Sequence, residues 1–202
     1  MAPGSVLAIM AHPDDAELWT GGTLALHALH APVIVAVPAH DAMRDEEAIA
    51  GAAVLGTHLE LIPRLDDAIV LSLIERHRPE VLITHPVHDV HPDHRATTHA
   101  VLAGLPDAHI ATGMPQRLYS CDTYNSLTMD GPVDADVIVD ITSTYPQKRR
   151  ALAEHASQPI DDHFGPMAHT LSTLWGQRTG VARAEAFTAI PILGRLPGAT
   201  HL

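Results

Sequence analysis

Short apolar runs alternate along the chain with longer segments in which apolar residues recur at helical spacing. Short continuous apolar runs are typical of buried strands, and a recurrence of three to four residues is typical of helices. The pattern predicts strands over residues 5–10, 33–37, 59–62, 80–84, 118–121 and 137–141. It predicts helices over residues 14–29, 44–55, 67–78, 93–105, 143–156 and 163–177. The stretch 106–115, which begins and ends with proline, is predicted to be a mobile loop.

Strands that alternate with helices are typical of parallel βαβ units. We therefore expect an α/β fold in which helices cover both faces of a mostly parallel sheet. The 202 residues fit one compact domain and leave no room for two of ordinary size. No repeat or linker divides the sequence, so residues 1–202 are predicted to form a single domain.

Composition excludes several classes of partner. Asp and Glu number 24 against 12 Lys and Arg, a net charge of −12, whereas nucleic acids and anionic membranes require a basic face. The single cysteine, Cys121, rules out an internal disulfide and a cysteine-rich zinc module. No apolar run is long enough for a signal peptide or a membrane helix. These features favour a cytoplasmic protein that acts on a small molecule, and they leave open whether it forms a homo-oligomer.

A polar cluster follows the first predicted strand, at the start of a helix. It reads Ala-His-Pro-Asp-Asp-Ala-Glu over residues 11–17. In open α/β sheets, ligands bind at the carboxyl ends of the strands. Proline and two carboxylates also suit a helix N-terminus for purely structural reasons, and this interpretation stands beside the functional one.

A second cluster of the same kind follows the fourth predicted strand, and its end reads His-Pro-Asp-His over residues 91–94. If the two strands are neighbours, the clusters converge. Imidazole and carboxylate together suit zinc and related divalent metals, and three protein ligands leave a position for water. His12 and Asp15 are three apart and can face one point, while Asp14 projects elsewhere and could reach that water. His91 and His94 are also three apart, so one could bind the metal while the other faces the substrate.

The two motifs, in this order, resemble the PIG-L/LmbE-like family of zinc-dependent N-deacetylases. Further matches extend over most of the chain: Gly21 to Leu24, Arg44 to Glu47 with Leu55-Gly56, Asp140 to Gln158, and Glu185 to Phe187. The resemblance implies a Rossmann-like three-layer fold, with the site at the carboxyl ends of the first and fourth strands. It implies zinc ligands at His12, Asp15 and His94. It also implies a general base at Asp14 and an acid or oxyanion-stabilising group at His91.

The resemblance implies supporting roles for other residues. Asp93 would orient a histidine of the cluster, and Glu17 would support the loop. Arg44 would contact the substrate, as would Asp66, for which Asp67 is an alternative match. His155 matches the family pattern, although a packed helix histidine is an equally good interpretation. His85 and His88 are expected to line the loop without binding metal.

The sequence departs from the family pattern in its rim loops. The loop after the second strand reads Val-Pro-Ala-His-Asp over residues 37–41, where many members carry Thr-x-Gly-Glu. Asp89 stands where some thiol-pathway members have a tyrosine, a role left to Tyr119, Tyr124 or no residue. Trp19 and Trp175 are candidate platforms for stacking on a sugar.

These residues predict an amide hydrolase that removes an N-acetyl group from an amino sugar or a related small metabolite. The metal would lower the pKa of a bound water, and Asp14 would take its proton. The alternatives are an amidase of thiol conjugates, a deacylase of a secondary-metabolite intermediate, a two-metal phosphoesterase, and a non-catalytic metal-binding module. Zinc is the expected metal, and iron(II) suits the same donors.

Overall fold

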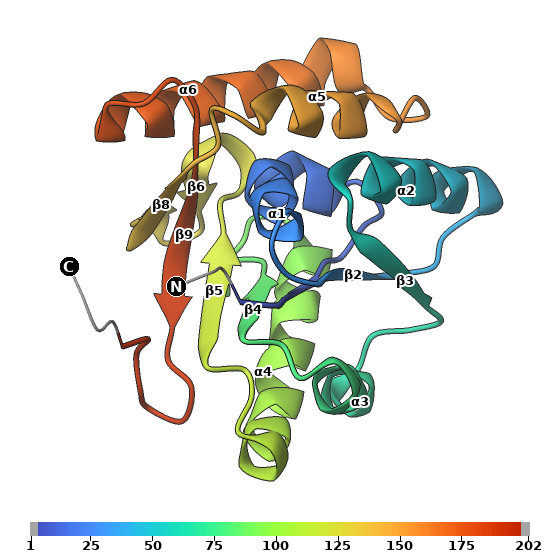
Figure 1. Ribbon diagram of the computed structural model, residues 1–202, viewed down its shortest axis with the longest axis vertical. Coiled ribbons are helices and arrows are strands. Elements are labelled where there is room, and N and C mark those ends of the chain that lie inside the picture. Colours follow the sequence, from blue (N-terminus) through green and yellow to red (C-terminus); the bar gives the residue numbers. More distant parts are fainter. Residues whose placement is uncertain (1–3, 199–202) are drawn as a thin grey trace.

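The computed structural model describes residues 4–198 and contains a seven-stranded sheet in the order β3-β2-β1-β4-β5-β9-β8 (Figure 1). Strands β1 to β5 run parallel to one another. Strand β9 pairs antiparallel with β5, and β8 pairs antiparallel with β9. The strand bounds are Val6–Ile9 (β1), Val33–Pro38 (β2), His58–Ile62 (β3), Val81–Thr84 (β4), Arg117–Cys121 (β5), Val137–Asp140 (β8) and Ala184–Ile190 (β9). The prediction of an α/β fold with a mostly parallel sheet is confirmed.

Six α-helices form the two outer layers (Figure 1). Their bounds are Gly21–Ala28 (α1), Ala42–Leu55 (α2), Asp67–His77 (α3), Pro92–Thr112 (α4), Tyr145–Ala153 (α5) and Gly165–Thr179 (α6). Helices α3 and α4 pack on one face of the sheet, and α1, α5 and α6 contribute to the core on the other. The protein is therefore a three-layer structure, as expected from the alternating pattern.

The apolar character of β1 follows from its central place in the sheet. Val6 and Ala8 lie in the core on the side of α1, whereas Leu7 and Ile9 lie in the core on the side of α3 and α4. All four side chains are fully buried, because a strand covered on both faces needs apolar residues at every position. This is why the sequence shows a continuous run here rather than alternation.

The predicted loop over residues 106–115 is wrong for most of its length, because α4 continues through Pro106 to Thr112. Proline removes one helical hydrogen bond, but the turns that continue past it bury Ala108 in the core shared with α3. The helix ends at Gly113, whose φ of 72° suits glycine. Burial of the amphipathic face outweighs the local cost of the proline.

Three further features were not predicted. Two π-helical turns, Ala16–Thr20 (η1) and Ile160–Phe164 (η3), precede α1 and α6. A short 3-10 turn, Tyr124–Ser126 (η2), leads into a two-stranded hairpin, Leu127–Thr128 (β6) and Gly131–Pro132 (β7). No helix within residues 4–198 is both long and apolar enough to span a membrane.

Candidate metal centre

The two polar motifs meet at one edge of the sheet. Strand β1 pairs directly with β4 in parallel register, with Val6 opposite Val81. The loops that follow both strands therefore leave the sheet side by side. The first loop carries His12 to Asp15; the second carries His85 to His91 and leads into α4, whose first turn carries His94. The condition for the two clusters to converge, that the first and fourth strands are neighbours, is therefore met.

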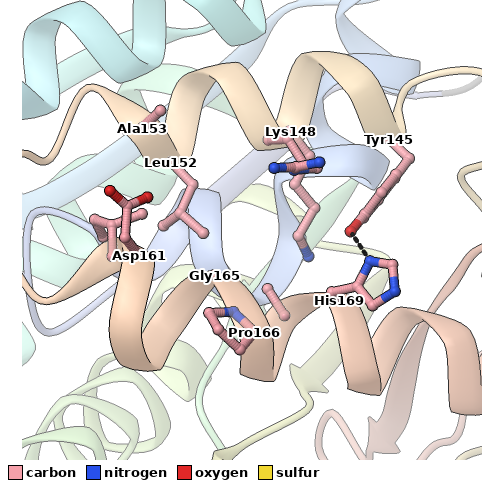
Figure 2. Close-up of a pocket in the computed structure, with 11 residues that line it drawn as sticks. Tyr145, Lys148, Leu152, Ala153, Asp161, Gly165, Pro166 and His169 are labelled. Carbon is pink, nitrogen blue, oxygen red and sulfur yellow. Dashed lines mark hydrogen bonds between the residues drawn. The ribbon is translucent and has the colours of Figure 1, made fainter.

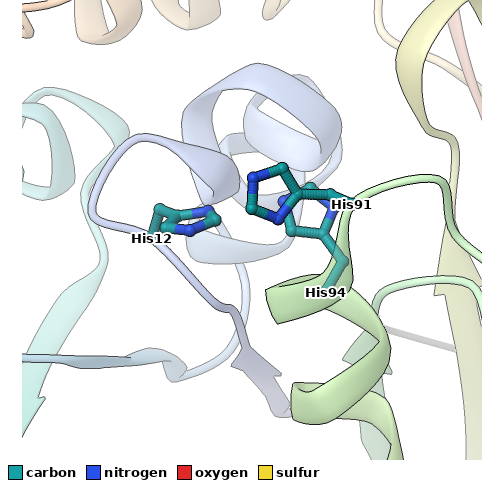
Figure 3. Close-up of side chains that lie close together, drawn as sticks. All are labelled: His12, His91 and His94. Atoms are coloured by element: carbon teal, nitrogen blue, oxygen red, sulfur yellow. The ribbon is translucent and has the colours of Figure 1, made fainter.

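The ring of His12, from the first loop, lies close to the rings of His91 and His94 at the start of α4 (Figure 3). The ring centroids of His12 and His91 are 4.8 Å apart, and those of His12 and His94 are 5.3 Å apart. Asp15, from the first motif, contacts a histidine of each motif. Its Oδ2 is 3.1 Å from His12 Nδ1, and its Oδ1 is 3.4 Å from His94 Nε2. The fold thus brings together the residues that the sequence singled out as ligands.

The described part of the chain contains two sets of three residues whose potential ligand atoms lie within 4.8 Å of one another inside each set. One set is His12, His91 and His94, and the other is Asp15, His85 and His94. His94 belongs to both sets and is fully buried. A divalent metal at this cluster would therefore have His94 as a ligand in either arrangement.

Sequence reasoning placed His85 beside the cluster but not in it. The side chain is fully buried, stacks on His94 at a centroid distance of 3.8 Å, and lies 3.3 Å from Asp15 Oδ2. The backbone N–H of Ala11 donates to His85 Nε2 at 3.0 Å. That hydrogen bond uses the lone pair of Nε2, and the other ring nitrogen, Nδ1, is buried without a hydrogen-bond partner among the described residues. The only sequence signal for this close packing is that His85 directly follows a buried strand.

Asp14 occupies a different position from Asp15, as its predicted role requires. It is 5% exposed, and the Arg44 guanidinium of α2 donates to its Oδ1 at 2.8 Å. Burial, followed by the neighbouring Asp15 carboxylate, raises the pKa of Asp14, although Arg44 opposes this shift. The structure thus brings Arg44 to the cluster. Asp14 is a carboxylate with raised proton affinity, which suits a group that accepts a proton.

The charges around Asp15 and His94 reinforce one another. Burial raises the pKa of Asp15, but the charges of His85 and His94 outweigh it and hold that pKa well below its usual range. Burial lowers the pKa of His94, but Asp15 and Asp89 outweigh it and raise that pKa to about 9. Metal binding at His94 would accordingly release a proton.

The residues with predicted supporting roles lie at different distances from the cluster. Asp93 is exposed, and its Oδ2 is 3.3 Å from His12 Nε2. Glu17 is buried beside His155, with 3.6 Å between Oε2 and Nε2. Asp66 caps α3 by accepting from Ile69 N at 2.9 Å. No contact in the described residues joins Asp66 to the histidines, and its role toward a substrate stays a prediction.

Aromatic side chains form one wall of the cluster. The Tyr124 ring stacks on His94 at a centroid distance of 5.8 Å and meets Trp19 edge to face at 5.1 Å. Trp19 is 2% exposed and donates from Nε1 to Asp15 Oδ1 at 3.1 Å. Tyr124 is therefore the tyrosine at the site, whereas Tyr119 lies on β5 near Phe187.

The two tryptophans do not serve as stacking platforms for a sugar. Trp19 and Trp175 are both 2% exposed. Trp175 donates from Nε1 to the buried Asp122 at 2.6 Å. The expectation that they offer exposed faces to a substrate is wrong, because Trp19 is buried in the main core and Trp175 in a smaller apolar cluster with Val133, Ala184 and Ala186.

A separate cavity of about 270 Å³ lies between α5, η3 and α6 (Figure 2). Its lining includes Tyr145, Lys148 and His169. The Tyr145 hydroxyl is hydrogen-bonded to His169 Nδ1 at 3.1 Å, and Lys148 is paired with Glu185. Because these polar groups already have protein partners, the cavity offers little catalytic chemistry, and the histidine cluster is the better candidate site.

The donor set of the histidine cluster fits a divalent metal. His94 Nε2 is buried and has no hydrogen-bond partner among the described residues. Its other ring nitrogen, Nδ1, is 3.1 Å from the carboxylate of Asp89. A histidine held on one side by a carboxylate, with its second nitrogen directed at another acid and imidazole, is typical of metal-ligating histidine. The residues therefore fit zinc or iron(II) as a cofactor.

Comparisons with known proteins support the fold. No protein-family model matches the chain. Among solved structures, it is similar to the 4-carboxy-2-hydroxymuconate hydratase GalB of Pseudomonas putida KT2440, with a TM-score of 0.80, 20% identity and 99% of each chain covered. It is similar to the N,N'-diacetylchitobiose deacetylase of Pyrococcus horikoshii, with a TM-score of 0.72, 21% identity, and 94% of this chain and 84% of that one covered.

A third structure is the zinc-inhibited form of the teicoplanin deacetylase Orf2, with a TM-score of 0.66 and 17% identity over 92% of this chain and 98% of that one. Several of these neighbours are deacetylases of the type that the sequence motifs resemble. At these identities the likeness confirms the fold implied by that resemblance. It also shows that the fold carries both deacetylases and a hydratase.

Proposed function

We propose that this protein is a PIG-L/LmbE-like amide hydrolase that depends on a divalent metal, with zinc as the expected ion. Its substrate would be an N-acetylated amino sugar or a related small metabolite. Hydrolysis adds the oxygen of water to the acetyl carbon, breaks the carbon–nitrogen bond and yields acetate and a free amine. The net charge of −12 favours a small molecule over nucleic acid or an anionic membrane.

The residues divide into groups that hold the metal and groups that move protons. His12, Asp15 and His94 would hold the ion, which supplies Lewis acidity when bound. Asp14 would accept a proton from the attacking water and deliver it to the leaving amine. His91, half-buried at the start of α4, would stabilise the developing oxyanion.

One observation supports this proposal more than any other. Asp15 contacts imidazoles from both motifs, while its neighbour Asp14 points to a separate, buried position beside Arg44. Adjacent carboxylates with different partners can take different roles, one as a ligand and one as a base. The raised pKa of Asp14 fits the second role.

The test is to measure zinc content and acetate release together, using N-acetylglucosamine and N,N'-diacetylchitobiose as substrates. Wild type, Asp14→Asn and the matched exposed-acid control Asp107→Asn would be compared. We expect one zinc per chain in all three proteins, and acetate from wild type and Asp107→Asn only. Absence of zinc from wild type, or undiminished turnover by Asp14→Asn, would contradict the proposal.

The metal should be varied in the same assay. The donor set suits zinc and iron(II) alike, and one structural neighbour was solved in a form described as zinc-inhibited. Reconstitution of metal-free protein with each ion, including an excess of zinc, would identify the ion that supports turnover.

A larger substrate is an alternative within the same chemistry. A groove of about 370 Å³ is lined on one side by residues 86–88, in the loop that leads to His91, and on the other by Ser120 and Thr188 of β5 and β9. Such a groove has room for the distal part of a thiol conjugate or of a secondary-metabolite intermediate. Faster acetate release from conjugated substrates than from free N-acetylglucosamine would favour this alternative.

A hydratase is the second candidate function, and it rests on the similarity to GalB. That match covers 99% of both chains, so the two proteins share the fold over almost their whole length. Addition of water to a carbon–carbon double bond also needs an activated water and a proton donor, which the same residues could provide. Loss of ultraviolet absorbance from a conjugated unsaturated dicarboxylate, without acetate release from any amide, would favour the hydratase.

A further inference from the structure

Asp89 is a buried carboxylate in the loop between β4 and α4, and it contacts both histidines of the second motif. Its side chain is fully buried. Oδ2 is 3.1 Å from His94 Nδ1, and Oδ1 accepts from the backbone N–H of His91 at 2.8 Å. One carboxylate therefore organises the predicted metal ligand and the predicted oxyanion-stabilising residue together.

The surrounding backbone fixes Asp89 in place. Its own N–H donates to the carbonyl of Pro86, and the Arg95 guanidinium donates to the carbonyl of Asp89 at 2.6 Å. The ring of His85 stacks on the ring of His94, with 3.8 Å between their centroids. The imidazole of His94 therefore has little freedom to turn. The contact between Asp89 and His94 is thus part of a rigid arrangement.

The chemistry of the contact determines which nitrogen of His94 faces the cluster. An ionised carboxylate only accepts hydrogen bonds, so Nδ1 must carry the proton that lies between it and Asp89. The lone pair that remains for a metal is then that of Nε2, the buried atom without a hydrogen-bond partner. A neutral amide at the same position could donate as well as accept, and it would no longer impose this tautomer.

Asp93, the acid that the motif itself contains, makes a different contact. It is largely exposed and reaches His12 rather than His94. An exposed carboxylate has weaker control over an imidazole, because water competes for the hydrogen bond and screens the charge. The buried Asp89 is better placed to orient a ligand.

We propose that Asp89 is the positioning residue of the metal centre, holding His94 in the Nδ1–H tautomer so that Nε2 binds the metal. This inference rests on the proposed function, because it assumes that the cluster holds a divalent ion. It also explains the departure of the sequence at this position, where some family members carry a tyrosine.

The test compares the zinc affinity of three folded proteins by competition with a chromophoric chelator: wild type, Asp89→Asn and Asp122→Asn. Asp122 is a matched control, because it is a buried carboxylate that binds Trp175 rather than the histidines. We expect Asp89→Asn to bind zinc about 10- to 100-fold more weakly than wild type. We expect Asp122→Asn to retain wild-type affinity even if its thermal stability falls.

Two outcomes would separate this inference from the proposed function. Wild type that binds no zinc would overturn both, whereas equal affinities of wild type and Asp89→Asn would overturn this inference alone. Should Asp89→Asn fail to fold, the wild-type protein loaded with ¹¹³Cd provides the test. We expect nuclear magnetic resonance coupling of cadmium to Nε2 of His94, and coupling to Nδ1 instead would overturn the inference.

Discussion

Two clusters of buried charged groups lie near the segment that joins β1 to α1: the pair Lys148–Glu185 and the histidine cluster. They differ in how many of their polar atoms have hydrogen-bond partners. Near the start of α1, Glu185 accepts from Gly22 N at 3.0 Å, from Thr23 N at 2.8 Å and from Lys148 Nζ at 2.5 Å. Both members of the ion pair are nearly inaccessible. In the histidine cluster, by contrast, buried His94 Nε2 lies 3.4 Å from Asp15 Oδ1 and makes no hydrogen bond with any described residue.

The difference separates a structural cluster from a functional one. A buried carboxylate that accepts from a lysine and from two N–H groups at a helix N-terminus has all the partners it needs. A buried imidazole nitrogen without a partner is costly unless it receives a ligand. We infer that Lys148 and Glu185 join α5 and β9 to α1, whereas the histidine cluster is arranged for a metal.

The largest expected effect is the loss of turnover in Asp14→Asn, which tests whether the histidine cluster is functional. Loss of a general base should reduce the turnover number by a factor of about 10² to 10⁴. Zinc affinity should stay close to that of wild type, because Asp14 is outside both sets of converging ligand atoms. Parallel measurement of steady-state kinetics and zinc content checks this, and a variant that lost zinc would move Asp14 into the ligand set.

In the structural cluster, Lys148→Met should lower the free energy of unfolding and leave zinc affinity unchanged. Removing one partner leaves Glu185 charged and buried, which typically costs about 3–5 kcal/mol of unfolding free energy. Urea denaturation measures this cost, and the zinc affinity of the folded fraction should not change. The double variant Lys148→Met with Glu185→Gln serves as the control, and it should recover part of the lost stability.

Removal of the metal is expected to destabilise the protein through the histidine cluster. Zinc present at about 100 times its dissociation constant should stabilise the folded state by about 2.7 kcal/mol. Thermal unfolding with and without a chelator measures the shift. The same treatment should produce no shift in His94→Ala, and a shift retained in that variant would place the metal elsewhere.

A smaller effect is expected from Trp175→Phe, which removes a hydrogen bond to a second satisfied carboxylate. Buried Asp122 would lose the indole N–H and become partly unsatisfied, at a cost of about 1–3 kcal/mol. Chemical denaturation should detect this loss, with unchanged KM and zinc affinity. A change in KM would instead connect Trp175 to substrate binding.

The smallest effect concerns Asp66, for which the sequence and the structure suggest different roles. Replacement by Asn should have little effect on stability, because asparagine is also a good helix N-cap. If Asp66 also binds the substrate, the same variant should raise KM. Unchanged KM would leave the carboxylate with the capping role alone, and Asp67→Asn would then test the alternative match.

The sequence determined the layers, most strands and helices, and the two motifs whose residues form the cluster. Continuous apolar runs predicted buried strands such as Val6–Ile9 because both faces of a central strand are covered. The residues over 11–17 and 91–94 each follow a predicted strand, which put them at the carboxyl ends of the sheet, where ligands bind. Local pattern and chemistry were sufficient for these conclusions.

Tertiary structure decided what depends on contacts between distant segments. The passage of α4 through Pro106 depends on burial against α3, and a local proline rule cannot include that energy. The packing of His85 on His94, the placement of Tyr124 beside the histidines and the pairing of Asp89 with Nδ1 depend on loops that meet only in the folded chain. Spacing along the sequence identifies the groups that can bind or react, but only the fold fixes which atoms face each other.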